Sequence, residues 1–417
     1  MNSLKVFRND AFPAPTSPSL SPRLPRLPML PRLPGLRRLG LPLTLALTLV
    51  AASACSSERA DAAVDTSAMV FGMPPAEVYV EDYDGPPVVG ETLTMAPFLA
   101  PLAEGNRTHE VRIDIVKQEI EVGDGVRYEA WTFGGAVPGP VLHVREGDRV
   151  IFTMKNRSDE AVDVTAPYGA ASAPFLAQLQ ASGHHRQEAA TFPQLHSMDL
   201  HSGTVAMDDK WRNVGPGQTI TFEWVANYPG VYLYHCGTPG VLHHMSMGQY
   251  GAVVVSPRDG YPTDHLVDQE FVIVQSEFYL KPDGNGSWEY DAEAAALKQP
   301  LIVAFNGHQA RHWSDPIPVT EGERVRLYVL NVGPSDVSSF HVVGAIFDRV
   351  WYEGNVENEW RGMQTVLLGA SNGAVMEWIV PEPGKYAMVD HEFADAEKGA
   401  KGLFIAAPRQ VAENPGR

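Results

Sequence analysis

The chain has 417 residues, which is enough for two domains with substantial apolar cores. Its formal net charge of −18 disfavours binding to nucleic acid or to an anionic membrane surface, but not binding of a small anionic substrate, which responds to the local field. The two cysteines are too few for a disulfide scaffold, and the 37 glycines and 34 prolines suit short strands joined by many turns.

Residues 1–54 have the composition of an export signal and not of a folded domain. A segment rich in Pro, Arg and Leu precedes the apolar run LGLPLTLALTLVAASA, which is too short for a comfortable membrane span and ends in small residues. The following cysteine, Cys55, completes the sequence AASAC, which resembles a bacterial lipobox. We therefore expect an exported protein, either periplasmic or anchored to the outer membrane by a lipid on Cys55. Ordinary cleavage after Ala54 or Ala62 is the alternative.

Residues 55–104 are rich in Pro, Gly, Ala and acidic residues, and we interpret them as a tether followed by a surface arm. From residue 105 the apolar residues recur with a period of two, as in VRIDIVKQEIEV and VIFTMKN. This pattern predicts strands, and hence a first β-sandwich domain over residues 105–257. Residues 165–190 interrupt the pattern with a loop that allows a short helix. We interpret His184 and His185 in this loop as solvated residues and not as metal ligands.

The second half of the chain repeats the first. Three pairs of segments share their pattern, namely EGDRVIFTMKN (146–156) with EGERVRLYVLN (321–331), QLHSMDL (194–200) with SSFHVVG (338–344), and PGVYLYHC (229–236) with PGKYAMVDH (383–391). The offset suits a duplicated domain, so we predict an all-β chain with a second β-sandwich over residues 258–410. In the second copy Asp390 falls where Cys236 stands, so this copy cannot form a blue-copper site.

The segment YHCGTPGVLHHMSMGQYG, residues 234–251, contains the strongest candidate metal ligands. Cys236 is followed eight residues later by His244, and then by a soft sulfur donor at Met247 and a carbonyl donor at Gln249. A thiolate, imidazoles and a weak axial ligand form the ligand set of a type 1, blue-copper site. Both Met247 and Gln249 are therefore candidates for the axial position.

Two metal sites follow from the alternation of side chains along a strand. His235 and Cys236 are adjacent, so they must point to opposite sides and serve different sites. His196 and His201 are five residues apart, so they also face opposite ways. One face then carries a type 1 copper set and the other carries part of an all-histidine copper site with a carboxylate beside it. The first set is His196, Cys236 and His244, and the second is His201, His235 and Asp199.

The second site needs another imidazole. His341 and His391 lie in segments of the second domain that are equivalent to the ligand-bearing segments of the first. A neighbouring subunit can bring these segments to the site more readily than the same chain can. We therefore predict a ring of subunits with each catalytic copper at a subunit interface and with an open coordination position for substrate.

With HSMDLH (196–201), YHC (234–236), FHVVGAIFDRVW (340–351) and VDH (389–391) in this order, the chain resembles the copper-containing nitrite reductases over residues 105–408. The resemblance implies two tandem cupredoxin domains, which are Greek-key β-sandwiches, in a homotrimer. It also implies one-electron reduction of nitrite to nitric oxide and water, with electrons from a cupredoxin or a c-type cytochrome.

Residue by residue, the resemblance implies two coppers per chain. Type 1 copper would be bound by His196, Cys236 and His244. Type 2 copper would be bound by His201 and His235 together with His391 of the partner subunit. The resemblance further implies that Asp199 and His341 are the pair that handles protons, and that Val343 limits how the substrate lies on copper.

Two features depart from the family pattern. Gln249 stands where the family has its axial methionine, and a harder oxygen donor would favour Cu(II) and lower the potential. Met247, only three residues after His244, is the less favourably spaced alternative for that role. The second departure is the insertion at residues 165–190, which would cover the type 1 site and change its electron donor.

Two other functions stay open at this point. A laccase-like two-domain multicopper oxidase would need several His-x-His pairs for a trinuclear cluster, and the chain has none. A non-enzymatic copper electron-transfer lipoprotein would need neither Asp199 nor His341 nor His391. A changed substrate, such as hydroxylamine or oxygen, is also left open by Gln249.

Overall fold

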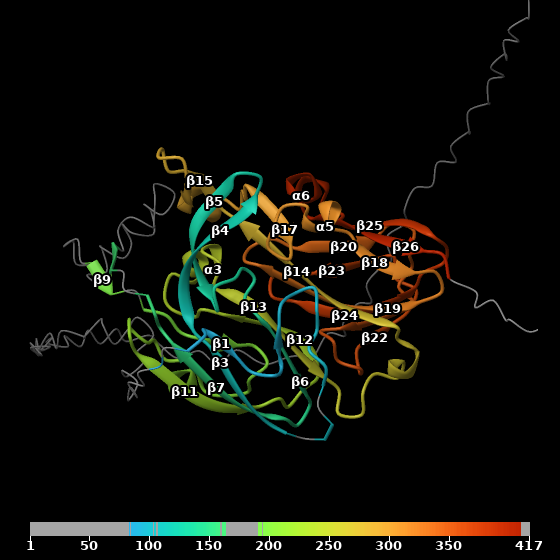
Figure 1. The fold of residues 1–417 in the computed structure, drawn as a ribbon, viewed down its shortest axis with the longest axis horizontal. Coiled ribbons are helices and arrows are strands. Elements are labelled where there is room, and N and C mark those ends of the chain that lie inside the picture. Colours follow the sequence, from blue (N-terminus) through green and yellow to red (C-terminus); the bar gives the residue numbers. More distant parts are fainter. Residues whose placement is uncertain are drawn as a thin grey trace, which may run out of the picture. The chain divides into compact units, whose positions relative to one another are not determined.

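The computed structural model of the chain describes residue 83 and residues 85–102, 104–105, 107–158, 161–163, 191–193 and 195–409. The predictions for the export signal, for the lipid site at Cys55 and for the insertion at 165–190 lie outside these residues. The described chain consists of strands with a few short helices, which confirms the all-β prediction (Figure 1). None of the described helices is long and apolar enough to cross a membrane.

Two sheets from the first half of the described chain form a sandwich. One sheet has the order β1-β3-β7-β11, with β1 (Val88–Val89), β3 (Thr108–Ile113), β7 (Arg149–Lys155) and β11 (Thr219–Val225). The other has the order β10-β12-β13-β6-β2, with β10 (Asp199–Leu200), β12 (Gly230–His235), β13 (Tyr250–Ser256), β6 (Val141–Arg145) and β2 (Leu93–Thr94). Side chains such as Phe152 and Tyr234 fill the space between the sheets, as the period of two requires.

Short elements occupy the connections of this first sandwich. They are the strand pair β8 (Ala161–Asp163) and β9 (Thr191–Pro193), and the helices α2 (Met207–Lys210) and α3 (Val241–Ser246). Helix α3 is the next element after β12 and carries His244. The end of the strand, the short turn with Cys236 and the helix thus present the candidate ligands of this segment.

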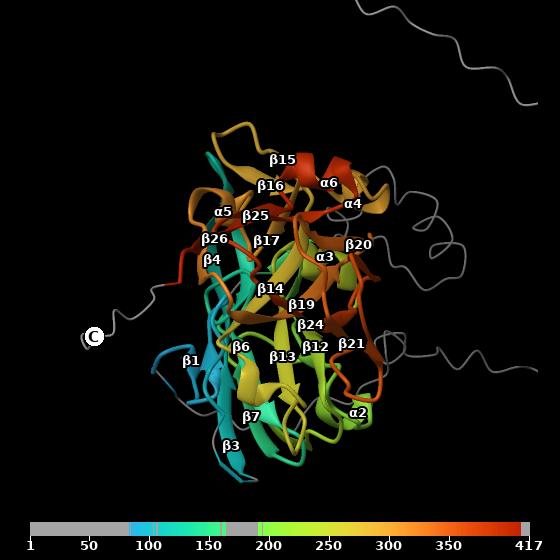
Figure 2. The same ribbon diagram turned by 90° about the vertical axis from the view of Figure 1, so that its right-hand side faces the viewer.

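The second half of the described chain forms another sandwich (Figure 2). Its larger sheet has the order β17-β14-β19-β24-β21-β22, with β17 (Ile302–Phe305), β14 (Gln269–Phe278), β19 (Arg324–Gly333), β24 (Gly373–Ile379), β21 (Arg349–Tyr352) and β22 (Glu359–Trp360). The facing sheet has the order β18-β26-β25-β20-β23, with β18 (Ile317–Thr320), β26 (Lys401–Ala407), β25 (Gly384–Asp390), β20 (Ser338–Val342) and β23 (Thr365–Leu368). The helical elements are η2 (Asp264–Leu266), α4 (Ala292–Ala296), α5 (Arg311–Ser314) and α6 (Phe393–Lys398).

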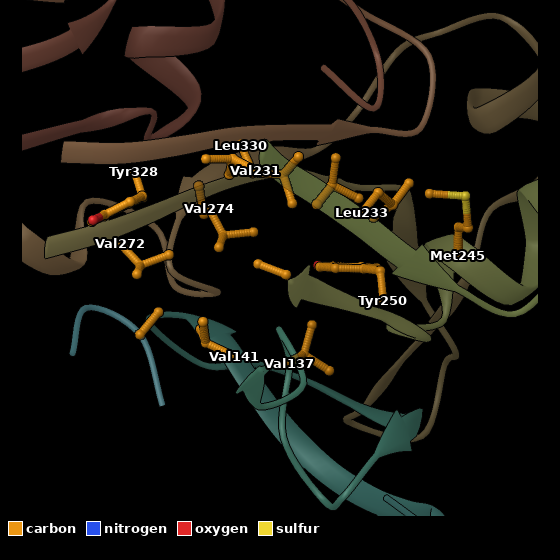
Figure 3. Close-up of a cluster of buried hydrophobic side chains, with 14 of the residues drawn as sticks. Val137, Val141, Val231, Leu233, Met245, Tyr250, Val272, Val274, Tyr328 and Leu330 are labelled. Atoms are coloured by element: carbon orange, nitrogen blue, oxygen red, sulfur yellow. The ribbon is translucent and has the colours of Figure 1, made fainter. Parts of the chain in front are cut away.

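A shared sheet and a shared core join the two sandwiches. The sheet has the order β15-β16-β5-β4, in which β15 (Leu280–Pro282) and β16 (Trp288–Tyr290) extend the hairpin of β4 (Ile115–Gly123) and β5 (Val126–Phe133). The core combines Val231, Leu233 and Tyr250 of the first half with Val272 and Tyr328 of the second (Figure 3). A Cβ at Gly373 would lie 2.4 Å from the Val231 carbonyl oxygen, so only glycine permits this approach of β24 to β12.

The strand registers define which positions of the two sandwiches are equivalent. Asp199 of β10 lies opposite His235 of β12, whereas His341 of β20 lies opposite Val389 of β25. Since His235 precedes Cys236 and Val389 precedes Asp390, Cys236 and Asp390 are equivalent, and Asp199 and His341 are equivalent. The letter-by-letter match of QLHSMDL with SSFHVVG would place His341 with Ser197, so the structure shifts that alignment by two residues.

Candidate metal centres

The first candidate centre consists of His196, Cys236 and His244, which lie in the connection before β10, immediately after β12 and in helix α3. The Cys236 Sγ lies 3.3 Å from His244 Nδ1 and 3.9 Å from His196 Nδ1, and the two Nδ1 atoms are 3.2 Å apart. All three side chains are buried. Ligand atoms bound about 2.0–2.3 Å from one tetrahedral ion are separated by roughly 3–4 Å, so this spacing fits a single metal ion.

Protonation at the first centre also suits a metal ion. Burial raises the pKa of the Cys236 thiol, but the positive charge of His244 and the hydrogen bonds with both imidazoles outweigh it and hold the pKa well below its ordinary value. The Ser197 amide donates a hydrogen bond to Cys236 Sγ at 3.4 Å, which further favours the thiolate. Burial lowers the pKa of His196, so its imidazole stays neutral. A thiolate with imidazoles is a donor set that copper and zinc accept.

Gln249 faces this centre with its side-chain oxygen. The Gln249 Oε1 lies 3.0 Å from His244 Nδ1, and the residue is completely buried. Its Nε2 has no hydrogen-bond partner among the described residues. Met247 instead contributes its side chain to the core shared by the two sandwiches. The geometry therefore places Gln249, and not Met247, with an oxygen donor directed at the ligand cluster.

The second candidate centre consists of Asp199, His201 and His235. The Nε2 atoms of His201 and His235 are 3.1 Å apart, and His235 Nε2 lies 3.6 Å from Asp199 Oδ2. The His235 Nδ1–H donates to the Cys236 carbonyl oxygen at 2.9 Å, so the lone pair of His235 is on Nε2 and faces the cluster. Partial burial, together with the electrostatic effect of the neighbouring His235, lowers the pKa of His201. Two imidazoles with converging nitrogens and an adjacent carboxylate fit a divalent metal ion.

The two centres are separate but covalently linked. Among the described residues, the groups of three or more His, Cys, Asp or Glu side chains with the spacing of a metal site are these two. His235 belongs to the second group and Cys236 to the first. One peptide unit therefore connects a residue of each centre, as the opposite-facing side chains of a strand require.

His341 and His391 do not join either centre within one chain. Their rings contact each other with centroids 5.5 Å apart, and the His391 ring also contacts Phe393. The His341 Nδ1–H donates to the Gln364 carbonyl oxygen at 2.5 Å. Large exposed apolar side chains occur in the same segments, namely Val343, Ile346, Leu367 and Phe393. The two histidines thus belong to a part of the second sandwich that presents apolar residues to solvent.

An aromatic stack beside the first centre was not expected from the sequence. The Trp131 ring lies 5.6 Å from the His196 ring and 5.1 Å from the His244 ring, measured between centroids. It also contacts His243, whose ring is stacked on Tyr290 of β16 at 4.4 Å and an interplanar angle of 20°. Burial lowers the pKa of His243 to about 3, so this imidazole is neutral. Spacing gives no signal for such contacts, because Trp131 and Tyr290 are far from His244 in the sequence.

Two segments of the chain, residues 114–167 and 176–259, match models of the family described as Multicopper oxidase. The copper-containing nitrite reductase of Neisseria gonorrhoeae is 36% identical over 336 residues, which cover 79% of this chain and 76% of the relative. The copper-containing nitrite reductase of Neorhizobium galegae is 29% identical over 325 residues, which cover 72% of this chain and 76% of the relative.

Solved structures of similar fold include copper-containing nitrite reductases. Copper nitrite reductase from Nitrosomonas europaea is 30% identical with a TM-score of 0.57, and the match covers 74% of this chain and 94% of the Nitrosomonas europaea chain. Cu-containing nitrite reductase from Thermus scotoductus SA-01 is 32% identical with a TM-score of 0.60, and the match covers 73% of this chain and 62% of the Thermus scotoductus chain. A multicopper oxidase structure is 22% identical with a TM-score of 0.56, and the match covers 78% of this chain and 97% of the oxidase chain, which is a likeness of fold alone.

Proposed function

The chain belongs to the family of copper-containing nitrite reductases, and on this basis we propose that it reduces nitrite to nitric oxide. The balanced reaction takes one electron and two protons per nitrite and releases nitric oxide and water. The observation that carries the proposal is that His235 and Cys236, which are joined by one peptide bond, belong to two different clusters that could each hold a metal ion. One cluster has the soft donors of an electron-transfer site, and the other has the imidazoles and carboxylate of a reactive site.

Each chain consists of two cupredoxin domains and would hold two coppers, both bound by residues of its first domain. The first centre would hold type 1 copper through His196, Cys236 and His244, with Gln249 as the axial ligand. The 3.0 Å distance between Gln249 Oε1 and His244 Nδ1 supports this axial role. Bound copper would supply one-electron chemistry at the first centre, and Lewis-acid and one-electron chemistry toward nitrite at the second.

The second centre would hold type 2 copper through His201 and His235, with a third imidazole from His391 of the partner subunit. The ring contact of His391 with His341, and the exposed apolar residues around them, support a subunit interface here. An interface of this kind, in which one subunit's first domain meets the next subunit's second domain, closes into a ring, and we propose a homotrimer. Val343, which is 49% exposed, would then face the substrate and restrict its orientation.

Asp199 and His341 would provide the two protons. Asp199 Oδ2 is 3.6 Å from His235 Nε2, so the carboxylate lies beside the position where nitrite would bind. Because His341 Nδ1–H is held by the Gln364 carbonyl oxygen, Nε2 is the nitrogen that can accept and release a proton. Protonation of a nitrite oxygen makes it a far better leaving group, since it departs as water and not as oxide.

The electron donor and the location also belong to the proposal. A cupredoxin or a c-type cytochrome would deliver the electron to the first centre. The leader composition supports export to the periplasm, and AASAC at Cys55 supports a lipid anchor to the outer membrane.

The two alternative functions are less supported. A laccase-like oxidase needs a trinuclear cluster, whereas the second group among the described residues contains only two histidines and a carboxylate. A simple electron carrier does not need Asp199 beside His235. The match to multicopper oxidase models is expected from the shared cupredoxin fold.

An anaerobic assay of the copper-loaded protein tests the proposal. With a chemical reductant and nitrite, the protein should release nitric oxide, and a His201→Ala variant that keeps its blue colour should not. Oxygen uptake with a laccase substrate, or fully copper-loaded protein that releases no nitric oxide, would overturn it.

A further inference from the structure

The two equivalent positions Cys236 and Asp390 receive the same hydrogen bond. In the first domain the Ser197 amide donates to Cys236 Sγ at 3.4 Å. In the second domain the Ser339 amide, which occupies the position of Ser197 by strand register, donates to Asp390 Oδ1 at 2.9 Å. The carboxylate therefore takes the place of the thiolate in a domain whose described residues form no metal-binding cluster within one chain.

Asp390 is completely buried, and its carboxylate accepts several hydrogen bonds. Oδ1 accepts a second amide hydrogen bond, from Glu392 at 3.0 Å, and Oδ2 accepts one from Gln275 Nε2 at 2.6 Å. The Ser338 hydroxyl donates to Gln275 Oε1 at 2.7 Å, which orients that amide. Three donors partly offset the cost of burying the carboxylate, although burial still raises the pKa of Asp390, and they come from three separate segments of the chain.

These hydrogen bonds connect the strand that carries His341 to the turn that carries His391. Ser338 and Ser339 begin β20, in which His341 lies two residues further along, and Asp390 and Glu392 flank His391. The His391 amide itself donates to the Ser339 carbonyl oxygen at 2.8 Å. The distance between the two imidazoles therefore depends on the ladder of β20 and β25 together with these hydrogen bonds to Asp390 at its end.

We propose that Asp390 is a positioning residue for the copper site between subunits. In the first domain a metal ion bound to Cys236 would join the strand end to the neighbouring connection. In the second domain Asp390 and its three donors do this with hydrogen bonds, and they set the direction in which His391 reaches the partner subunit. This proposal rests on the proposed function, because it requires His391 to be a ligand of type 2 copper.

The experiment uses the full-length, copper-loaded protein with three substitutions. Asp390→Ala removes the acceptor of all three hydrogen bonds. Asp390→Asn retains an acceptor oxygen and matches the shape, while the Gln275 amide can reverse to accept from the new NH₂ group. Thr263→Val is the matched control, because the Thr263 hydroxyl is a buried donor, to Glu377 Oε1 at 2.6 Å, outside this network.

The measured quantities are the affinity for type 2 copper by chelator competition, the type 2 signal by electron paramagnetic resonance, and the blue absorbance on the same samples. We expect Asp390→Ala to bind type 2 copper about 10–100-fold more weakly, as is typical when a group that orients a ligand is removed. Asp390→Asn should restore most of the affinity. Blue absorbance should be unchanged in both Asp390 variants. Thr263→Val should retain type 2 copper even if its melting temperature falls as far as that of Asp390→Ala.

Wild-type affinity in Asp390→Ala would overturn the proposal, and so would an equal loss of type 2 copper in Thr263→Val. If Asp390→Ala loses its blue colour, the test uses Gln275→Ala, which removes one donor and should lower the affinity for type 2 copper to a smaller extent. An unchanged affinity in Gln275→Ala would also overturn the proposal. A wild-type protein that binds one copper per chain would instead overturn the proposed function, which separates the two failures.

Discussion

His341 stands in the second domain at the strand position that Asp199 occupies in the first. On the neighbouring strand, Asp199 lies opposite His235 and His341 lies opposite Val389. His235 immediately precedes Cys236, and Val389 immediately precedes the equivalent residue Asp390. The two residues proposed to handle protons are thus equivalent positions of one duplicated domain. In a ring where first and second domains meet, they would approach one substrate from two sides.

Both residues should therefore be needed for turnover but not for copper binding. We expect Asp199→Asn and His341→Asn each to lower the rate of nitrite reduction by about 10²–10⁴-fold, the usual worth of a positioned acid or base. Copper content and blue absorbance should stay at wild-type levels in both. Steady-state assays with parallel copper analysis check this, and a rate within a factor of two of wild type would remove the residue from the mechanism.

Gln249 should set the potential of the first centre. We expect Gln249→Met to raise the type 1 reduction potential, because a thioether favours Cu(I) more than an amide oxygen does. Redox titration followed at the blue absorbance measures it. Met247→Leu is the control and should leave the potential unchanged, since Met247 packs in the apolar core. An unchanged potential in Gln249→Met would argue against Gln249 as the axial ligand.

The second centre should be completed by another subunit. His391→Ala should lose type 2 copper and retain the blue colour, and His201→Ala should do the same. Co-expression of the two variants should then restore nitrite reduction in part, because some interfaces would combine an intact His201 with His391 of the partner subunit. Mixed oligomers that remain inactive, although they form, would contradict a shared site.

The aromatic stack should tune the first centre from the second domain. Tyr290→Leu removes the ring that stacks on His243, and stacking of this kind contributes about 0.5–1.5 kcal/mol. We expect a loss of unfolding free energy of this size together with a shift of the type 1 absorption spectrum, since Trp131 and His243 contact His244. Tyr290→Phe retains the ring and should match the wild-type spectrum. Identical spectra for all three proteins would exclude the coupling.

His143 should make the folded protein sensitive to mild acid. Its Nδ1–H donates to the Ala100 carbonyl oxygen, its Nε2 accepts from the Ser256 hydroxyl, and burial lowers the pKa of His143 to about 4. The unfolded chain, with a pKa of about 6.5, binds the proton more readily, so stability is fully present above pH 6.5 and falls as the pH drops toward 4.

For this residue alone the loss between pH 7 and pH 5 is about 2 kcal/mol of unfolding free energy. Denaturant unfolding of wild type and His143→Gln at both pH values measures it. The difference between the two proteins cancels the contribution of the copper ligands. The variant should be less stable at pH 7 and should lose less on acidification, and parallel pH dependence would contradict the assignment.

The grouping of these side chains into two clusters could be predicted because the signal is local. His235 ends β12 and Cys236 follows it, so the period of two assigns them to different faces before any tertiary structure is known. The same rule assigned His196 and His201 to different sites, although only Asp199 and Leu200 between them form a strand. The all-β class followed in the same way from the alternation of apolar residues.

Long-range features could not be predicted in this way. The equivalence of His341 with Asp199 depends on strand register, which similarity of short segments does not define. The contacts of Trp131 and Tyr290 with the histidines depend on β16 pairing with β5, where Trp288 lies beside Tyr128. That pairing joins strands about 160 residues apart, so it depends on the assembled core and not on local propensity.

The shared core of the two sandwiches has a consequence for how the chain can be divided. Val231 and Leu233 are covered by residues of the C-terminal half, and Tyr290 of that half covers His243. A fragment that stops after β13 would expose this apolar surface and would leave the thiolate centre open on one side. The two duplicated halves therefore depend on each other to fold. Truncation should give an N-terminal fragment that is colourless or aggregated.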